Sequence, residues 1–360
     1  ATCVALLTND NLGHELDRAR PHETDGRPEP AERPSPLLAM RSQMFLLRDP
    51  PAHTRLRGLV QGAFSPRMIE QMRPRIQAAV DHLVDAVERQ GEMDVIEDLA
   101  APLPVMVIVD MLGVPEGDRH LVRRWSREIV ETLELTDAPE VLDRGNGATV
   151  EFTAYLRDLA RTRRDRPGED LISALVHAED RGDALSEEEL TSTCILLLVA
   201  GHETSTNLIG NGLLALLRHP DQLERWRARP DLGRSAIEEI LRYDSPVQTT
   251  YRAVLRDMEF EGRRLRRGAS VAFMLGSANR DPAVFEHPHR LDITRDPNPH
   301  LSFSYGIHYC LGAPLARLEG QIAIQTLLRR APGLRLLGDT PVFHDTWASR
   351  GLVALPVRLG

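Results

Sequence analysis

One long helical pattern dominates the hydrophobic and polar positions of this chain, and it predicts a helix from Ser186 to about Arg218. Ser186 and Glu189 have the spacing of a capping box, and Leu185 and Leu190 can close a hydrophobic staple around it. A proline shortly after Arg218 ends the pattern. About 32 residues with a rise of ~1.5 Å each would extend roughly 48 Å, which is the width of a whole domain.

The middle of this predicted helix, Ile195 to Ala200, is apolar on all sides and must be buried. It runs into Ala200-Gly201-His202-Glu203-Thr204-Ser205, which places glycine and polar groups at the centre of a buried helix. Glycine costs about 1 kcal/mol there, and an unpaired hydroxyl or carboxylate costs more. One explanation is a kink in which Thr204 bonds back to the backbone. The other is a functional site at Glu203 and Thr204.

The rest of the periodicity predicts a mixed α+β protein that is mainly α. Helical spacing predicts further helices over Met68–Arg89, Val105–Leu112, Asp118–Leu133 and Ala148–Arg164. Strand patterns occur at Thr250–Leu255, Ser270–Leu275 and Leu352–Arg358. A further helix is predicted to be capped by Asp49 and opened by Pro50 and Pro51. Residues 21–36 are rich in proline and charge and lack periodicity, which predicts a mobile loop.

Composition and charge restrict the class of protein. The 360 residues, 42% of them hydrophobic, contain no low-complexity linker and fit a single domain over 1–360. The net charge of −9 argues against nucleic acid as the main partner. The longest uncharged apolar run, Cys194 to Gly201, is far too short to cross a bilayer, so we expect a soluble protein without a membrane partner. Three separated cysteines form no disulfide framework and favour a reducing cytoplasm.

Cys310 carries the strongest chemical signal, within Phe303-Ser304-Tyr305-Gly306-Ile307-His308-Tyr309-Cys310-Leu311-Gly312. Apolar residues repeat at helical spacing after it, which places Cys310 at or just before a helix N-terminus. There the helix dipole and free N–H groups lower the pKa of a thiol and can keep a thiolate as an iron ligand. Gly306 and Gly312 would let backbone approach a flat macrocycle, against which Phe303 could pack. The alternative for a lone cysteine is a buried small residue without chemistry.

The pattern Phe-x-x-Gly-x-His-x-Cys-x-Gly resembles the signature of the cytochrome P-450 monooxygenases, with Ser304 where that family usually has glycine. The resemblance implies the cytochrome P-450 fold, a helix-rich prism with small β-sheets. It also implies haem b as cofactor, with Cys310 as the iron ligand, and O2 as co-substrate. Phe303 and Gly312 are then residues that contact the haem.

Residues 200–205 resemble the Ala/Gly-Gly-x-Asp/Glu-Thr-Thr/Ser motif of the same family's oxygen-binding helix. The resemblance implies a widened helix turn at Ala200 and Gly201 that makes room for O2 beside the iron. It also implies that Thr204 and Glu203 are catalytic and pass protons to this site.

Cationic side chains are expected around the haem propionates. His53 and Arg57 lie at i and i+4, on one face of a helix, which suits two carboxylates but would equally suit an exposed amphipathic helix. The sequence around them resembles the family's propionate-binding helix, and the resemblance adds Arg252 and His308 as further partners.

An ExxR pair, Glu239 and Arg242, lies between the two motifs. Alone, such a pair is usually a surface salt bridge. The resemblance implies a buried structural network of Glu239, Arg242 and Arg290. It also implies that the substrate pocket is lined by Leu196, Val199, Ala200, Val247, Gln248, Trp347 and Ala348, which favours a largely apolar small substrate.

The implied activity is insertion of one oxygen atom of O2 into a C–H bond. No GxGxxG or flavin-type motif is present, so a separate ferredoxin and ferredoxin reductase are expected to deliver electrons from NAD(P)H. A non-catalytic haem-thiolate sensor or carrier is the alternative, although a sensor needs no proton relay. A zinc site of His287, His289, His308 and Cys310 is a weaker alternative, because the spacing matches no tight ligand set.

The resemblance extends from about His53 to Gly360 and is closest to soluble bacterial members. We expect this protein to be a monomer. The chain ahead of His53 looks short for this family, so an N-terminal strand or helix is expected to be missing.

Overall fold

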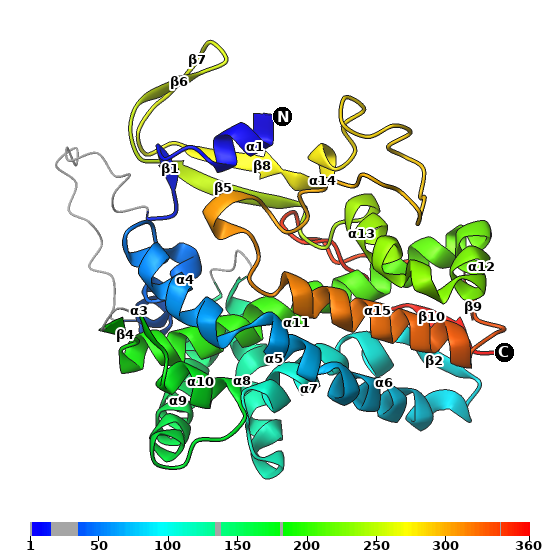
Figure 1. The fold of residues 1–360 in the computed structure, drawn as a ribbon, viewed down its shortest axis with the longest axis horizontal. Helices are drawn as coiled ribbons and strands as arrows, with labels where there is room; N and C mark the ends of the chain where they lie inside the picture. The colour runs from blue at the N-terminus through cyan, green and yellow to red at the C-terminus, as the bar shows by residue number, and fades with distance from the viewer. Residues whose placement is uncertain (1, 16–34, 134–137, 181–182, 339) are drawn as a thin grey trace.

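One long central helix organises the structure, a computed structural model that describes all residues except 1, 16–34, 134–137, 181–182 and 339. This helix, α11 (Glu187–Arg218), crosses the whole molecule, and α15 (Ala313–Arg330) lies beside it (Figure 1). The capping box of Ser186 and Glu189 is present, as predicted. Leu190 is buried and Leu185 packs against the same core.

Helices form most of the chain. Their bounds are α1 (Thr2–Leu7), α3 (Pro36–Ser42), α4 (Ala52–Ala63), α5 (Pro66–Gln71), α6 (Arg73–Glu88), α7 (Pro102–Met111), α8 (Arg119–Val130), α9 (Pro139–Asp165), α10 (Leu171–Val176), α12 (Pro220–Ala228), α13 (Gly233–Tyr243) and α14 (Leu275–Ala278). Short 3-10 turns are η1 (Phe45–Leu47), η3 (Glu116–Asp118), η4 (Glu131–Leu133), η5 (Pro230–Leu232) and η6 (Gly306–His308), and a π-turn is η2 (Ile96–Ala100).

The strands form small antiparallel sheets. Their bounds are β1 (Leu12–Gly13), β2 (Glu92–Asp94), β3 (Glu179–Asp180), β4 (Asp183–Ala184), β5 (Thr249–Val254), β6 (Met258–Phe260), β7 (Arg263–Leu265), β8 (Ser270–Met274), β9 (Arg335–Leu336) and β10 (Pro356–Arg358). One sheet has the order β1-β5-β8, with Arg252 opposite Val271, and another has the order β2-β10-β9. The β6-β7 hairpin projects from the top of the molecule in Figure 1.

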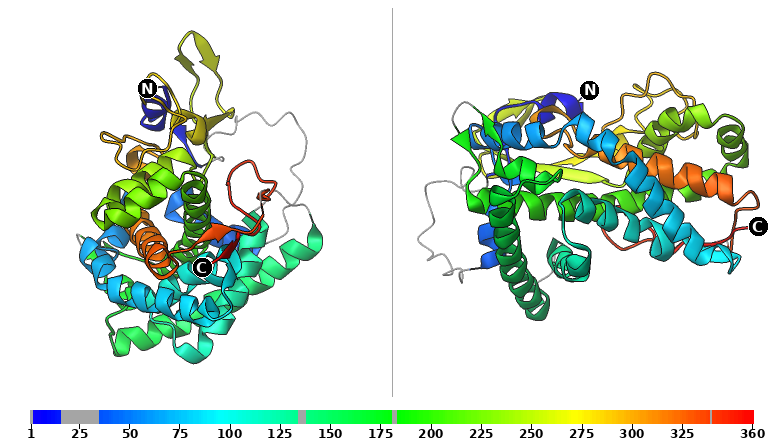
Figure 2. Two further views of the ribbon diagram at one scale, coloured as in Figure 1. Left: turned by 90° about the vertical axis from the view of Figure 1, so that its right-hand side faces the viewer. Right: turned by 60° about the horizontal axis from the view of Figure 1, so that its bottom comes forward.

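The main core surrounds α11, which contacts α7, α13 and α15 among others. Two further views show helices on several sides of it (Figure 2). Ile195, Leu198 and Leu213 of α11 are fully buried, and burial of each such side chain stabilises the fold by about 1.5–3 kcal/mol. Gly320 lets α15 approach α11 closely, because a Cβ there would lie 3.0 Å from a methyl of Leu208.

Several predicted elements have different bounds. The helix predicted over Met68–Arg89 divides into α5 and α6, and Pro74 in the first turn of α6 explains the division, because proline suits a helix start and disrupts an interior. Helix α9 begins earlier than the predicted Ala148. The last predicted strand is only β10, while Leu352 forms an isolated bridge with Phe343.

The predicted capping role of Asp49 is wrong. Pro51 occupies the N-cap position of α4 and gives no side-chain cap. The Asp49 carboxylate instead accepts hydrogen bonds from the backbone N–H groups of His14 at 2.8 Å and Glu15 at 3.1 Å. A long-range contact therefore replaces the local one, and it fixes the chain after β1 beside α4.

The loop predicted over residues 21–36 lies outside the described residues, apart from its last two positions. There Ser35 caps α3, which begins at Pro36. None of the described helices combines the length and the apolarity that crossing a bilayer requires.

Candidate active site

A largely apolar cavity of about 280 Å³ lies between α11 and the loop that carries Cys310. Ala200, Gly201 and Thr204 line it from α11. Across the cavity, the loop contributes Phe303, His308, Cys310 and Gly312, which the sequence predicted at this site. The two separate sequence motifs therefore face one space.

Cys310 lies directly before α15, whose N-cap is Gly312. Burial raises the pKa of the thiol, while the backbone N–H groups of Gly312 and Ala313 and the guanidinium groups of Arg57 and Arg317 favour the thiolate. The Cys310 N–H donates to the Phe303 carbonyl at 3.0 Å and fixes the loop. Coordination to a soft metal ion would shift Cys310 to the thiolate, because a coordinating thiol is deprotonated.

The loop has a left-handed backbone at Ser304, where φ is +62°, and at Gly306, where φ is +76°. Ser304 thus adopts the conformation that glycine favours, at a cost of about 1–2 kcal/mol for a residue with a side chain. The Ser304 hydroxyl is buried and has no hydrogen-bond partner in the described part of the chain. The loop keeps its turn despite the absent glycine.

The α11 side differs from the prediction in two respects. The predicted widened turn is absent, because α11 is α-helical throughout residues 200–205. The Thr204 hydroxyl donates to the Ala200 carbonyl at 2.8 Å, which is the backbone bond that the kink explanation proposed. Glu203 does not line the cavity; it is exposed and accepts a hydrogen bond from the Ser349 hydroxyl at 2.7 Å. Only Thr204 of the predicted pair faces the cavity.

Glu319 of α15 is a cavity residue that the sequence did not reveal. It is 2% exposed and lines the cavity. Burial raises the pKa of its carboxyl to about 7, and a hydrogen bond with the Ser205 side chain opposes the shift. The two walls of the cavity thus meet through Glu319 and Ser205. An isolated glutamate on a helix gives no sequence signal for such a position.

A cluster of imidazole and guanidinium groups forms one edge of the site. The ring of His308 lies 4.2 Å from that of His53 and 4.5 Å from that of His14, measured between centroids. Arg57 donates to the Tyr309 carbonyl at 2.5 Å, and Arg252 donates to the Tyr251 carbonyl at 2.8 Å. The four residues predicted to hold propionates therefore converge, and His14 joins them.

Buried nitrogen atoms in this cluster have no hydrogen-bond partner among the described residues. They are both ring nitrogens of His53, Nε2 of His14 and Nδ1 of His308. Burial and the neighbouring cations lower the pKa of His14 to about 3 and that of His308 to about 2. Buried polar groups in proteins almost always have partners. Unpaired donors beside two guanidinium groups fit the carboxylates of a haem, which would supply the missing acceptors.

His14 could not be found from the sequence. It lies far from His53 along the chain, and only the contact of Asp49 with the His14 backbone brings it to α4. No local pattern around residue 14 indicates that contact.

The ExxR pair is buried, as predicted, but the third member of the network is different. Glu239 and Arg242 are both fully buried, and their fork has two N–O distances of 2.8 Å. The side chain of Arg290 is exposed, and only its carbonyl accepts from Arg242, at 3.0 Å. Arg295 donates to Glu239 at 3.0 Å in its place. Arg290 and Arg295 lie on one extended loop, whose path decides which guanidinium turns inward.

Of the predicted pocket residues, Leu196, Ala200 and Val247 line the cavity. Val199, Gln248, Trp347 and Ala348 do not. Val199 is buried in the core, and the Gln248 amide donates to the Ser245 carbonyl at 2.7 Å. Trp347 is 52% exposed and stacks on Tyr251, with 5.8 Å between the ring centroids. The segment of Trp347 and Ala348 is thus held against β5 at the surface.

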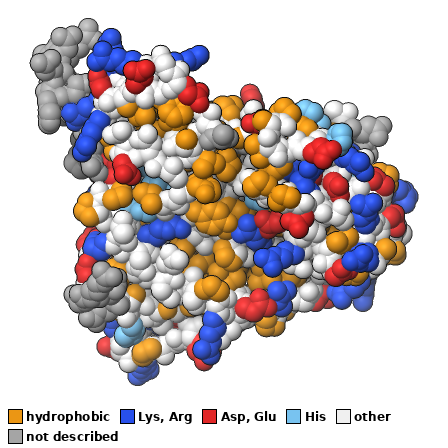
Figure 3. Space-filling view, turned by 45° about the horizontal axis from the view of Figure 1, so that its top comes forward, with side chains coloured by type: hydrophobic (Ala, Val, Ile, Leu, Met, Phe, Trp, Pro, Cys, Tyr) orange, Lys and Arg blue, Asp and Glu red, His pale blue; other side chains and the backbone are white. Residues whose placement is uncertain are grey.

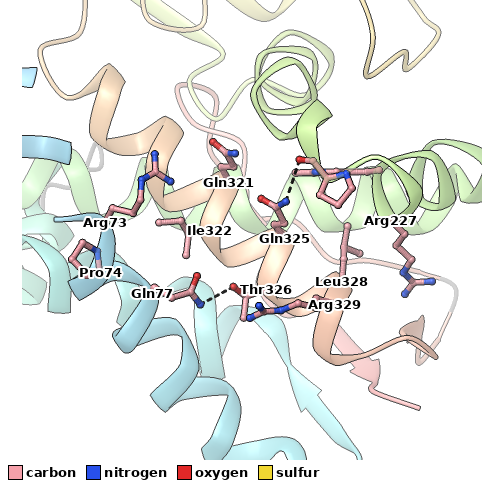
Figure 4. A pocket seen from close by; sticks show the side chains of 12 residues that line it. Arg73, Pro74, Gln77, Arg227, Gln321, Ile322, Gln325, Thr326, Leu328 and Arg329 are labelled. Atoms are coloured by element: carbon pink, nitrogen blue, oxygen red, sulfur yellow. Dashed lines mark hydrogen bonds between the residues drawn. The ribbon is translucent and has the colours of Figure 1, made fainter. Parts of the chain in front are cut away.

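A second cavity, of about 630 Å³, lies between α6, α12 and α15 (Figure 4). Arginine and glutamine side chains line much of it, and Gln77 donates to the Thr326 hydroxyl at 3.0 Å across it. It contains none of the predicted site residues. The residues of both sequence motifs line the first cavity instead.

The zinc alternative fails on position. His287 and His289 are exposed and lie outside the cavity that holds Cys310 and His308. Within the described residues, no three His, Cys, Asp or Glu side chains are grouped as a metal site.

On one face of the molecule, hydrophobic side chains gather centrally, with arginines and carboxylates mixed around them (Figure 3).

Comparison with known proteins gives one consistent result. The family model for cytochrome P-450 matches residues 2–229 and 231–331. The chain is 45% identical over 330 residues to a biotin biosynthesis cytochrome P-450 of Bacillus subtilis, covering 92% of this chain and 83% of that one. It is 44% identical over 314 residues to 6-deoxyerythronolide B hydroxylase of Saccharopolyspora erythraea, covering 86% and 76%.

A solved structure agrees over nearly the whole chain. A cytochrome P-450 in complex with an acyl carrier protein bearing hexadec-9Z-enoic acid superposes with a TM-score of 0.88 and 42% identity, covering 99% of this chain and 90% of that one. The predicted helix-rich fold with small sheets is confirmed. The family uses haem b, O2 and electrons from NAD(P)H. The protein therefore belongs to the cytochrome P-450 family, and it is a monooxygenase that inserts one oxygen atom of O2 into a C–H bond of a small molecule.

Proposed function

We propose that haem b binds in the cavity between α11 and the Cys310 loop, with Cys310 as its iron ligand. The observation that carries this proposal is the convergence of a cysteine at the mouth of α15 with unpaired buried imidazole nitrogens at the cavity edge. His53, Arg57 and His308 would hold the propionates, together with His14 and Arg252. Bound haem supplies O2 activation, and a thiolate ligand favours cleavage of the O–O bond.

The chain's own residues determine where protons can move. Two polar side chains of the α11 motif, Thr204 and Ser205, line the cavity, and Ser205 is hydrogen-bonded to Glu319. The proton of the Thr204 hydroxyl is directed to the Ala200 carbonyl, so its oxygen is free to accept a hydrogen bond from a water molecule in the cavity. We propose that Thr204 holds this water. Glu203, which contacts Ser349 on the outer side, would link the site to solvent.

The substrate is proposed to be a largely apolar small molecule. Leu196 and Val247 give apolar surface beside Ala200 and Gly201. The named relatives act in biotin biosynthesis and on 6-deoxyerythronolide B, and one solved relative holds a fatty acyl group on a carrier protein. A hydrocarbon chain or macrocycle, free or attached to a carrier protein, is thus the class to test.

Electrons are proposed to come from NAD(P)H through a separate ferredoxin and ferredoxin reductase, the arrangement general in this family. The unpaired cysteines Cys3, Cys194 and Cys310 support a reducing location such as the cytoplasm.

The decisive experiment is the difference spectrum of the reduced, CO-bound protein. Wild type should show the thiolate signature, and Cys310→Ser should not. Titration with fatty acids, terpenoids, steroids, macrolides and an acyl carrier protein loaded with a fatty acid, followed by the spin-state change, would then identify the substrate class. A wild-type spectrum without the thiolate signature would disprove the ligand assignment.

A further inference from the structure

The Glu238 carboxylate of α13 binds Arg317 of α15, the helix that follows Cys310. Glu238 accepts two hydrogen bonds from the Arg317 guanidinium of α15, from Nε at 2.5 Å and from Nη2 at 2.8 Å. His300 Nε2 lies 3.0 Å from the same carboxylate, and its Nδ1 accepts from the Ser302 N–H, so Nε2 carries the proton. Burial opposes ionisation of Glu238, but the hydrogen bonds from His300 and Arg317 outweigh it and lower the pKa to about 2.

The other faces of the Arg317 guanidinium contact the Cys310 loop. Its Cζ lies 4.5 Å from the centroid of the Phe303 ring, and its Nη1 donates to the Tyr309 hydroxyl at 3.2 Å. The Phe303 carbonyl in turn accepts from the Cys310 N–H. Arg317 thus fixes both sides of the loop and places a permanent positive charge near the Cys310 sulfur.

The stability of the pair does not explain this arrangement. The side chains of Arg317 and Glu238 are 30% and 22% exposed, and ion pairs that solvent can reach usually contribute little to the stability of a fold. The Arg317 guanidinium is held by Glu238, Phe303 and Tyr309, which is more order than a small contribution to stability requires. Its position beside the sulfur suggests an electronic role.

We propose that Arg317, oriented by Glu238, sets how strongly the Cys310 thiolate donates electron density to the haem iron. This inference rests on the proposed function of Cys310 as the iron ligand. A cation beside the sulfur holds negative charge on it and weakens its donation, which favours the reduced iron. Arg317 is a positioning residue, because it does not line the cavity and would act through the thiolate.

The test is a signed comparison of reduction potentials in the haem-loaded protein. Arg317→Gln leaves the Glu238 carboxylate uncompensated and should move the potential to a more negative value. Glu238→Gln leaves the guanidinium uncompensated and should move it to a more positive value. Arg317→Lys keeps the charge and should stay closest to wild type. A tenfold change in the ratio of oxidised to reduced protein corresponds to about 59 mV, which is the scale to resolve.

The sign distinguishes an electrostatic role from a structural one. Both single substitutions break the fork, so a purely structural role predicts shifts in the same direction, and that result would overturn the proposal. Unchanged potentials would overturn it as well. Arg330→Gln is the matched control, because it removes an equal charge from the far end of α15, where Arg330 pairs with Asp85 and Glu88, and it should leave the potential unchanged.

The reduced CO spectrum of each variant separates this proposal from the one on which it rests. A thiolate signature in all variants, with unchanged potentials, disproves only the role of Arg317. Absence of the signature in wild type disproves the ligand assignment itself. If Arg317→Gln fails to fold, Glu238→Gln and Arg317→Lys still test the sign.

Discussion

The two walls of the cavity differ in how their polar groups are satisfied. On the Cys310 wall, backbone N–H groups and two guanidinium groups act on one sulfur, and Ser304 is held in a left-handed conformation. On the α11 wall, the surface is mostly apolar, and the Thr204 hydroxyl bonds within its own helix. The Cys310 wall stabilises negative charge on the sulfur, and the α11 wall leaves an apolar space beside it. Substitutions on the two walls should therefore change different observables.

The strongest way to break the comparison is Cys310→Ser. A hydroxyl is a poor iron ligand and donates little electron density, so the thiolate signature of the reduced CO complex should disappear entirely. Cys3→Ala and Cys194→Ala are matched controls, because neither residue lines the cavity, and both should keep the spectrum. Retention of the signature in Cys310→Ser would place the iron ligand elsewhere.

The cationic edge of the Cys310 wall should determine haem retention. His53→Ala with Arg57→Ala should speed haem loss without changing the axial ligand, since hydrogen bonds to charged groups contribute about 1.5–3 kcal/mol each, or about 3–6 kcal/mol for two. Haem transfer to an acceptor apoprotein measures the rate. The single variant His14→Ala should show a smaller increase, and wild-type retention in the double variant would contradict the propionate assignment.

This edge also shows how far sequence alone could reach. Cys310, His308, His53 and the capping box of α11 were predictable, because each belongs to a local pattern whose spacing carries its own physical meaning. Local patterns do not specify which distant segments meet. His14 reaches the cluster only through the tertiary contact of Asp49.

The errors have the same cause. Arg295 displaces Arg290 because an irregular loop turns one side chain inward, and Trp347 lies at the surface because its segment pairs against β5. Glu203 and Thr204 are adjacent in the motif, yet helical geometry points Thr204 into the cavity and Glu203 toward Ser349. The sequence predicted the chemistry of the site better than its lining.

Glu319 connects the two walls, and its titration should sharpen the comparison. Its carboxyl has a pKa of about 7 in the folded protein and about 4.5 when unfolded. The folded state binds the proton more tightly, so this contribution to stability is fully present below pH 4.5 and is lost as pH rises through 7. The difference corresponds to about 3 kcal/mol.

Glu319→Gln should therefore become more stable relative to wild type as pH rises from 4.5 to 8. Urea unfolding followed by tryptophan fluorescence at several pH values measures this difference. Glu188→Gln, at an exposed position of α11, is the control and should follow wild type. A pH-independent difference for Glu319→Gln would mean that the carboxyl does not titrate in this range.

On the α11 wall, Thr204→Ala should separate electron use from product formation. Without the hydroxyl, the proposed water loses its anchor, and hydrogen peroxide release should compete with hydroxylation. Product per NAD(P)H should fall by up to about a hundredfold, the low end of what positioned proton donors contribute. The Cys310 spectrum should not change. The helix should survive, because alanine is the better helix former. An unchanged product yield would mean that the Thr204 hydroxyl only bonds to the Ala200 carbonyl and takes no part in proton delivery.

The smallest effect is expected for a substitution of Ser304, on the Cys310 wall. Ser304 has a φ of +62° and a buried hydroxyl without a partner among the described residues. Ser304→Gly removes the side chain that makes this conformation costly, although glycine also gains freedom in the unfolded chain. The net result should be a stabilisation of about 1 kcal/mol in urea unfolding, with an unchanged CO spectrum. Ser302→Gly is the contrasting variant, because the Ser302 hydroxyl donates to the Leu241 carbonyl at 2.7 Å, and it should destabilise. If Ser304→Gly destabilises as well, the hydroxyl has a partner in the haem-loaded protein, and the wall gains more from that contact than it loses in strain.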